Sequence, residues 1–190
     1  FEAYATPNPG KNCDHWITQY WDGSRWKTID VDCCIEDITF DPFDVPEGWT
    51  IYRGIDFGST NPTACIWIGV DGDDNWYILA EHYETEQTID YHAGIINSES
   101  VGKSIQATYG DPSGAQWIQE FAQRGIYITP ANKETGQNQE GWVRMGIEKV
   151  AEKLKLVPGH VVPSYQRVRN IDEGVSPGGG LPSLFIFSTC

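Results

Sequence analysis

The most regular pattern of apolar and polar positions lies between residues 50 and 84. Three runs with strand character follow one another there, TIYRGIDFG (50–58), TACIWIGVD (63–71) and NWYILAEHYE (75–84). Turn-forming residues separate the runs, and DGDD between the second and third is the clearest case. Because consecutive strands joined by short turns pair antiparallel, the pattern predicts a three-stranded antiparallel meander.

After this meander, helical and extended periodicities alternate. Ile89, His92 and Ile96 recur at helical spacing, and Ser113 and Gly125 are typical of a helix cap and a helix stop. The predicted elements are helices over 88–100, 115–125 and 138–156 and strands over 104–111 and 127–131. The last helix carries an apolar stripe of Val143, Ile147, Val150 and Leu154, with Lys149, Lys153 and Lys155 off it. The fold class is therefore α/β, a mixed sheet of a meander plus parallel strands, flanked by helices.

The two ends of the chain have a different character. Residues 1–49 are polar and aromatic, with a predicted hairpin at Asp22-Gly23, a strand-like KTIDVDCCI and a proline-containing connector over 41–50. They are interpreted as an N-terminal segment or linker, and residues 50–190 as the main domain. Within that domain, residues 157–183 are rich in Gly and Pro and predict an exposed hairpin or mobile loop, followed by a final strand, LFIFSTC.

Composition limits the classes of function. The chain has 190 residues, 39% of them hydrophobic, which suits one core. Its net charge of -14 is concentrated in residues 1–100, with 4 Lys or Arg against 19 Asp or Glu. An acidic chain has weak unaided affinity for nucleic acid and suits cations or a basic partner. No apolar run is long enough for a bilayer and no secretory leader is visible, so a soluble, unsecreted protein is expected. The five cysteines form no CxxC pair, which argues against a zinc site or disulfide framework.

Asp56 is the first candidate for chemistry, because it places a carboxylate inside the apolar run RGIDFGSTNPT. A charge at an inward-facing strand position is costly unless it is paired, and a bound cation would pair it. Gly58 would let a metal or phosphate approach the backbone, with Ser59 and Thr60 bracing the turn. The alternative is a strand-end aspartate that makes an Asx turn with Ser59 or Thr60.

Asp111, in YGDPSGAQW, lies where the fourth strand of the main domain meets its helix. Ligands gather at the carboxyl ends of strands in open sheets, so Asp56 and Asp111 are expected to form a metal site together. An ordinary turn residue before a helix is the alternative for Asp111. Glu81 could face the same site or be a solvated strand end, and Lys133 could contact phosphate or solvent. His82 and His92 have no partner at metal spacing and are expected to be half-buried structural residues.

The same segments, read together, resemble a known family. RGIDFGSTNPTACIWIGVDGDDNWYILAEHYETEQTIDYHAG, YGDPSGAQWIQEFAQRGIYITPANK, GWVRMGIEKVAEKLKL and LFIFSTC are similar, in order, to the C-terminal nuclease domain of the large terminase subunit of tailed bacteriophages. The resemblance covers residues 50–190. FEAYATPNPG at the start resembles the tail of the ATPase domain that precedes this nuclease.

The resemblance implies an RNase H-like fold and a metal-dependent endonuclease that cuts double-stranded DNA during genome packaging in the host cell cytoplasm. It implies Asp56 and Asp111 as catalytic ligands of two Mg²⁺ or Mn²⁺ ions, with Glu81, Ser59 and Lys133 in support. It also implies the terminase ATPase domain, the small terminase subunit and the portal as partners, and no membrane.

One feature of the family pattern is missing from the sequence. The family supplies a third acidic ligand from a helix after the last strand, whereas this sequence reaches Cys190 before such a segment. Asp172 and Glu173 are poor substitutes. We therefore expect a nuclease domain truncated at its C-terminus, with weak metal binding and little or no cleavage in isolation.

Three other functions compete with this one. IDFGST also resembles the phosphate loop of the actin, sugar-kinase and heat-shock ATPase group, but that fold needs a second domain and a second glycine-rich loop. A Holliday-junction resolvase shares the nuclease fold, but resolvases are normally basic dimers. A non-catalytic docking module of the packaging motor would instead use the acidic, aromatic surface to bind a basic partner.

Overall fold

The chain forms two compact units. The middle unit comprises Pro42–Asn132 with Thr189–Cys190, and the terminal unit comprises Phe1–Asp41 with Lys133–Ser188. This division does not coincide with the expected boundary between residues 49 and 50, and a functional domain over 50–190 stays a prediction. The structure is a computed structural model that describes residues 2–7, 14–21, 26–34, 38–58, 60–131, 139–170, 172, 174–175 and 179–190.

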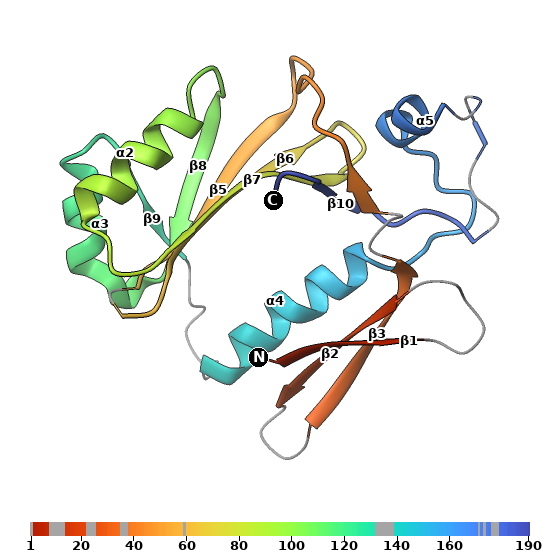
Figure 1. Ribbon diagram of the computed structural model, residues 1–190, viewed down its shortest axis with the longest axis horizontal. Helices are drawn as coiled ribbons and strands as arrows, with labels where there is room; N and C mark the ends of the chain where they lie inside the picture. Colours follow the sequence, from red (N-terminus) through yellow and green to blue (C-terminus); the bar gives the residue numbers. More distant parts are fainter. Residues whose placement is uncertain are drawn as a thin grey trace. The chain divides into compact units, whose positions relative to one another are not determined.

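A mixed sheet forms the core of the middle unit (Figure 1). Its strands run in the order β7-β6-β5-β8-β9. Their bounds are β5 Thr50–Asp56, β6 Thr63–Val70, β7 Trp76–Glu84, β8 Ile105–Gly110 and β9 Thr129–Pro130. β5, β6 and β7 pair antiparallel, whereas β8 pairs parallel with both β5 and β9. The predicted meander and the predicted mixed sheet are both confirmed.

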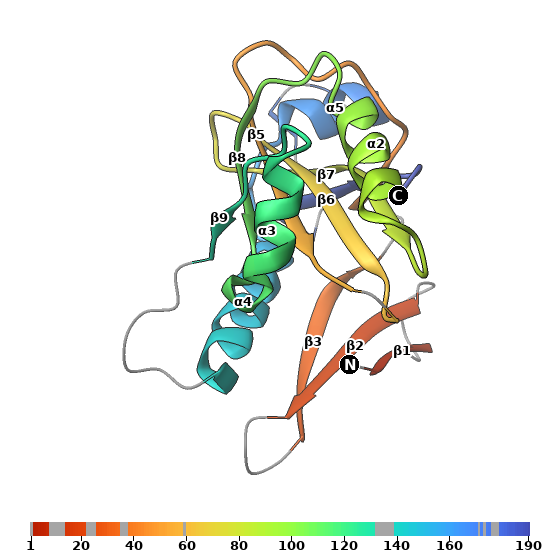
Figure 2. The ribbon, with the colours of Figure 1, turned by 90° about the vertical axis from the view of Figure 1, so that its left-hand side faces the viewer.

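The two faces of this sheet differ in burial, as the alternation of side chains along a strand requires. On β6, buried residues such as Cys65 and Trp67 alternate with half-exposed residues such as Ala64 and Ile66. Helices α2 (Ile89–Glu99) and α3 (Ala115–Ala122) lie side by side on the buried face (Figures 1 and 2). The opposite face carries the half-exposed residues, and this is the face on which Asp56 lies.

Local chemistry explains the helix ends. Thr88 caps α2, since its side chain accepts a hydrogen bond from the Tyr91 amide. Asp111, rather than the predicted Ser113, caps the next turn, the 3₁₀ helix η1 (Pro112–Gly114), and Gly114 then precedes α3. The prediction for Ser113 is wrong because the aspartate carboxylate already accepts from the Ser113 amide. Gly125, with φ of 80°, takes up the left-handed conformation after α3.

The buried charge of β5 is Arg53, not Asp56. Arg53 is 7% exposed, and its guanidinium donates to Thr108 Oγ1 and Ser100 Oγ, both at 2.9 Å. Ser100 is the C-cap of α2, so the negative end of the helix dipole faces the guanidinium. Burial lowers the pKa of Arg53 and raises the pKa of neighbouring Cys65 to about 12, which keeps that thiol protonated.

Asp56 is exposed at the last position of β5. The inward-facing carboxylate expected from the sequence is therefore a wrong interpretation, because Ile51, Arg53 and Ile55 occupy the buried phase of β5 and Asp56 falls in the other phase.

The terminal unit contains a three-stranded antiparallel sheet and a short parallel pair. β1 (Glu2–Pro7), β2 (Asp14–Trp21) and β3 (Trp26–Cys34) form the sheet, and β4 (Thr39–Phe40) pairs with β10 (Leu184–Phe187). The final strand and the strand in KTIDVDCCI are confirmed, while the Asp22-Gly23 turn lies outside the described residues. Phe40 and Phe185 stack with their ring centroids 4.8 Å apart, which joins the pair through its side chains.

Two predictions in the terminal unit are wrong. The exposed hairpin or mobile loop expected over residues 157–183 is wrong for α5 (Pro163–Arg169), a helix in which Tyr165 and Gln166 are buried. In α4 (Gln139–Lys153), Val150 of the expected stripe is 43% exposed, whereas Lys153 is 8% exposed. A lysine can bury its methylene stem and keep its ammonium group solvated, so charge alone did not place this residue outside. Val143 lies outside the described side chains.

None of the helices in the described part of the chain is long and apolar enough to cross a bilayer.

Candidate functional site

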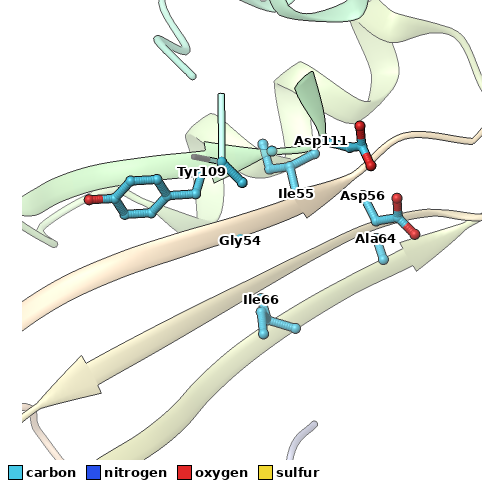
Figure 3. Close-up of a pocket in the computed structure, with 9 residues that line it drawn as sticks. Gly54, Ile55, Asp56, Ala64, Ile66, Tyr109 and Asp111 are labelled. Atoms are coloured by element: carbon cyan, nitrogen blue, oxygen red, sulfur yellow. The ribbon is translucent and has the colours of Figure 1, made fainter. Parts of the chain in front are cut away.

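Asp56 and Asp111 follow the ends of two neighbouring parallel strands. Ile55 of β5 and Gly110 of β8 are register partners, so each aspartate comes one residue after a paired position. Neighbouring strands lie about 4.8 Å apart, which places the two residues side by side at the same sheet edge. Both line an open pocket of about 450 Å³. Figure 3 shows the two carboxylates next to one another at its rim.

The remaining walls of this pocket are apolar or small. They are formed by Gly54, Ile55, Ala64, Ile66, Tyr109, Gly110 and Ala131. Carboxylate oxygens are the hard ligands that Mg²⁺ and Mn²⁺ prefer, and the glycines leave space beside them. The pocket can thus hold a hydrated divalent ion on one side and a flat or extended ligand along the other.

The ring of Phe57 packs against α3 and against the backbone segment that leads to Asp111. Its ring centroid lies 6.1 Å from that of Trp117 and 6.0 Å from that of Phe121, both on α3. A Cβ atom on Gly114 would collide with this ring, and one on Gly110 would lie 3.0 Å from it. The two glycines therefore let the segment that carries Asp111 pack directly on the residue that follows Asp56.

Asp111 has a structural role as well as a candidate chemical one. Its Oδ1 accepts a hydrogen bond from the Ser113 amide at 2.6 Å, which orients the carboxylate and caps η1. Both interpretations that the sequence left open for this residue, a turn residue and a pocket carboxylate, are compatible with this position.

The structure gives a different reason for a glycine at position 58 from the one expected. A Cβ atom there would collide with the carbonyl oxygens of Asn61 and Pro62, and the turn is closed by Thr63, whose hydroxyl donates to the Gly58 carbonyl at 2.8 Å. The glycine is required by this tight turn, and the sequence-based expectation that it leaves room for a phosphate stays a prediction.

The other predicted site residues do not join the pair. Glu81 is exposed on β7, opposite Ile66 of β6, and it does not line the pocket, because β6 separates β7 from β5. Ser59, Lys133 and Glu173 lie outside the described residues. Within the described ranges no group of three or more His, Cys, Asp or Glu side chains is arranged to hold a metal ion. The described site is thus a carboxylate pair.

His82 and His92 contact one another, and both are buried rather than half-buried as expected. Nε2 of His82 on β7 lies 2.8 Å from Nδ1 of His92 on α2, and the side chains are 6% and 1% exposed. One proton lies between the two rings, so the contact requires that they do not both become cations. Burial lowers the pKa of each histidine, and the neighbouring ring lowers that of His92 further. No sequence spacing links a strand residue to a helix residue in this way.

This pair makes stability depend on pH. Because both pKa values are lower in the folded chain than the unfolded value near 6.5, the unfolded chain binds more protons, and stability falls as the pH drops below that value. We expect the free energy of unfolding, from urea titrations, to decline between about pH 6.5 and pH 5 by up to about 1.4 kcal/mol per pH unit for each histidine. A flat profile over this range would contradict the assignment.

Comparison with solved structures shows which fold this is. The chain matches the P22 large terminase nuclease domain with a TM-score of 0.60 and 19% identity, over 84% of this chain and 72% of that one. It matches the large terminase of a thermophilic bacteriophage with a TM-score of 0.55 and 18% identity, over 84% of this chain and 34% of that one. It thus spans about a third of the length of the thermophilic phage protein. No protein-family model and no curated protein sequence matches.

The chain therefore has, over 84% of its length, the fold found in phage large terminase nuclease domains. The resemblance noted in the sequence is confirmed at the level of the fold.

Proposed function

We propose that this chain is the metal-dependent endonuclease domain of a viral DNA-packaging terminase. In this proposal it cuts double-stranded DNA, with Asp56 and Asp111 as the ligands of the catalytic metal ions. The observation that supports the proposal is the placement of both carboxylates in one pocket, at the ends of adjacent parallel strands. The fold likeness to terminase nuclease domains favours this function over a phosphotransferase. The ATPase domain, the small subunit and the portal would be its partners, in the host cytoplasm.

The residues fit a divalent cation through their donor atoms. Asp56 presents its carboxylate from an exposed strand end, and Asp111 presents one that the Ser113 amide orients. Two bound Mg²⁺ or Mn²⁺ ions would supply an activated water and stabilise the leaving oxygen of a phosphodiester.

Calorimetry with Mn²⁺ tests this proposal. We expect weak, saturable binding by the purified chain, because two carboxylates are fewer than the ligands a hard cation takes up. The heat should disappear in the Asp56→Asn, Asp111→Asn double variant and persist in Glu81→Gln, which keeps the pocket. An unchanged heat in the double variant would place the ion elsewhere and remove the basis for the nuclease.

A docking module is the second candidate, and the charge of the middle unit favours it. Residues 42–132 carry three Lys or Arg against thirteen Asp or Glu. All three cations are engaged: Arg53 is buried, Lys103 pairs with Glu99 and Arg124 pairs with Asp90. Such a surface suits a basic protein. In the same calorimetry, a pure docking module would show no heat that depends on Asp56 and Asp111.

A further inference from the structure

Gly54 lies in the middle of β5, a position at which a glycine has no local cause. It pairs with Ile66 of β6 on one side and with Tyr109 of β8 on the other. Its φ is not positive, so the backbone conformation there is open to any residue. A glycine inside a strand weakens a sheet, because it loses the most conformational freedom on folding and has no side chain to pack. The conformation of β5 therefore does not explain this residue.

Packing does not require the glycine either. A Cβ atom on Gly54 would have Cγ1 of Ile66 as its nearest neighbour, at 3.6 Å, an ordinary van der Waals distance. Gly58 and Gly114 are different, because a Cβ atom on either would collide with neighbouring atoms. A strand glycine that neither conformation nor packing requires is typical of a place where a ligand approaches the backbone closely.

The carboxylate pocket is where such a ligand would lie. Gly54 lines the same pocket as Asp56 and Asp111, and Figure 3 shows it between Ile66 and Tyr109. Side chains alternate along a strand, so position 54 faces the same way as Asp56. Two residues of a strand span about 6.7 Å. Gly54 thus forms a part of the pocket floor that is a short distance from the carboxylates.

The charge of the pocket restricts which part of a DNA strand can lie on Gly54. Among the described residues, those that line the pocket include no Lys or Arg, and the two carboxylates repel phosphate. Divalent ions on Asp56 and Asp111 would offset that repulsion only at the carboxylate end. The part of a strand that contacts Gly54 is therefore uncharged. In the backbone of duplex DNA, that part is the deoxyribose between two phosphates.

We propose that Gly54 is a substrate-contact position, which leaves room for the deoxyribose next to the cleaved phosphate. The sugar rests on β5 while the phosphate reaches the metal ions. This inference rests on the proposed nuclease function and adds a residue that determines whether the duplex enters the site. Because no basic side chain of the pocket holds the strand, binding of the duplex here depends on the divalent ions. A side chain at position 54 excludes DNA according to its size and leaves the metal ligands unchanged.

The test compares Gly54→Ala and Gly54→Val with the unsubstituted full chain, by fluorescence anisotropy of a labelled blunt DNA duplex. We expect the unsubstituted chain to bind the duplex in Mn²⁺ and not in EDTA. Gly54→Val should raise the chain concentration for half-maximal binding at least about tenfold, and Gly54→Ala should raise it less. Both variants should keep the calorimetric heat of Mn²⁺ binding. Their melting temperatures should stay the same or rise by about 2 °C, because a side chain favours the strand.

Ala107→Leu is the matched control, since it adds as many carbon atoms as Gly54→Val. Ala107 is half-exposed on β8, pairs with Tyr52 and lies outside the pocket, so this variant should bind the duplex normally. Unchanged duplex binding by Gly54→Val, or an equal loss in Ala107→Leu, would overturn the proposal. A lower melting temperature or a lost Mn²⁺ heat in Gly54→Ala would do so too, because the glycine would then serve the fold or the metal. So would a chain that does not bind the duplex in Mn²⁺.

The outcome is separable from that of the nuclease. If the Mn²⁺ heat and cleavage depend on Asp56 and Asp111 while Gly54→Val binds and cuts normally, the inference fails and the nuclease stands. If Gly54→Val weakens duplex binding but the Mn²⁺ heat does not depend on the aspartates, the contact at Gly54 stands and the nuclease fails.

Discussion

Asp111→Asn will abolish the weak metal-dependent DNA cleavage expected of this chain while the melting temperature stays close to that of the unsubstituted chain. The asparagine side chain keeps an oxygen that can accept the Ser113 amide, so the cap of η1 survives. It carries no charge, so a divalent ion loses one of the two anionic ligands in the pocket. This substitution therefore changes the activity without changing the stability.

Plasmid relaxation in Mn²⁺ and thermal unfolding measured on the same samples check this result. Asp111→Ala should lose the same activity and also about 1 kcal/mol of stability, because the cap is lost with the charge. Glu81→Gln removes an exposed carboxylate outside the pocket and should retain activity. Full cleavage by Asp111→Asn, or an equal loss in Glu81→Gln, would show that the charge of Asp111 is not what the reaction uses.

The elements that the sequence predicted best are those specified by contacts close in the chain. The meander over residues 50–84 followed from side-chain alternation and from turns such as the one at Asp71, whose carboxylate accepts the amides of Asp73 and Asn75 at 2.9 Å. Helix α2 followed from the helical spacing of Ile89, His92 and Ile96. The pairing of Asp56 with Asp111 could be anticipated because parallel strands bring their carboxyl ends to one edge.

The burial of charged residues could not be predicted from local sequence patterns in the same way. The orientation of Asp56 depends on which of the two alternating phases of β5 faces the helices, and the phase that carries Arg53 is the buried one. Arg53 is tolerated inside because Thr108 and Ser100, from β8 and the end of α2, meet it there. The His82 and His92 contact likewise joins two elements whose spacing no local pattern encodes.

Composition misled the prediction for residues 157–183. Glycine and proline are frequent there, but Pro163 stands at the first turn of α5, a position where proline favours a helix. Asn170 ends that helix in the left-handed conformation, with φ of 54°. Between them, Tyr165 contacts Phe40 with ring centroids 5.6 Å apart, a contact that only the folded chain creates.

Phe57→Ala will destabilise the middle unit by about 2 kcal/mol, less than for a fully buried ring because Phe57 is half-buried, and lower cleavage even in the fraction that remains folded. The ring is the common contact of Trp117 and Phe121 on α3 and of Gly110 and Gly114 next to Asp111. Its removal leaves a cavity between the two backbone segments that carry the aspartates. Positioning errors of about 1 Å at a reacting group can cost about a hundredfold in rate, so the two effects should appear together.

Urea unfolding gives the first quantity, and single-turnover cleavage at saturating Mn²⁺, corrected for the folded fraction, gives the second. Phe57→Leu fills most of the same volume and should recover most of the stability and rate, since volume-conserving apolar changes are tolerated best. Gly114→Ala approaches the same contact from the other side and should resemble Phe57→Ala, because its methyl group collides with the ring. If Phe57→Ala unfolds early yet cleaves at the full rate per folded molecule, the ring supports the fold but does not set the separation of the carboxylates.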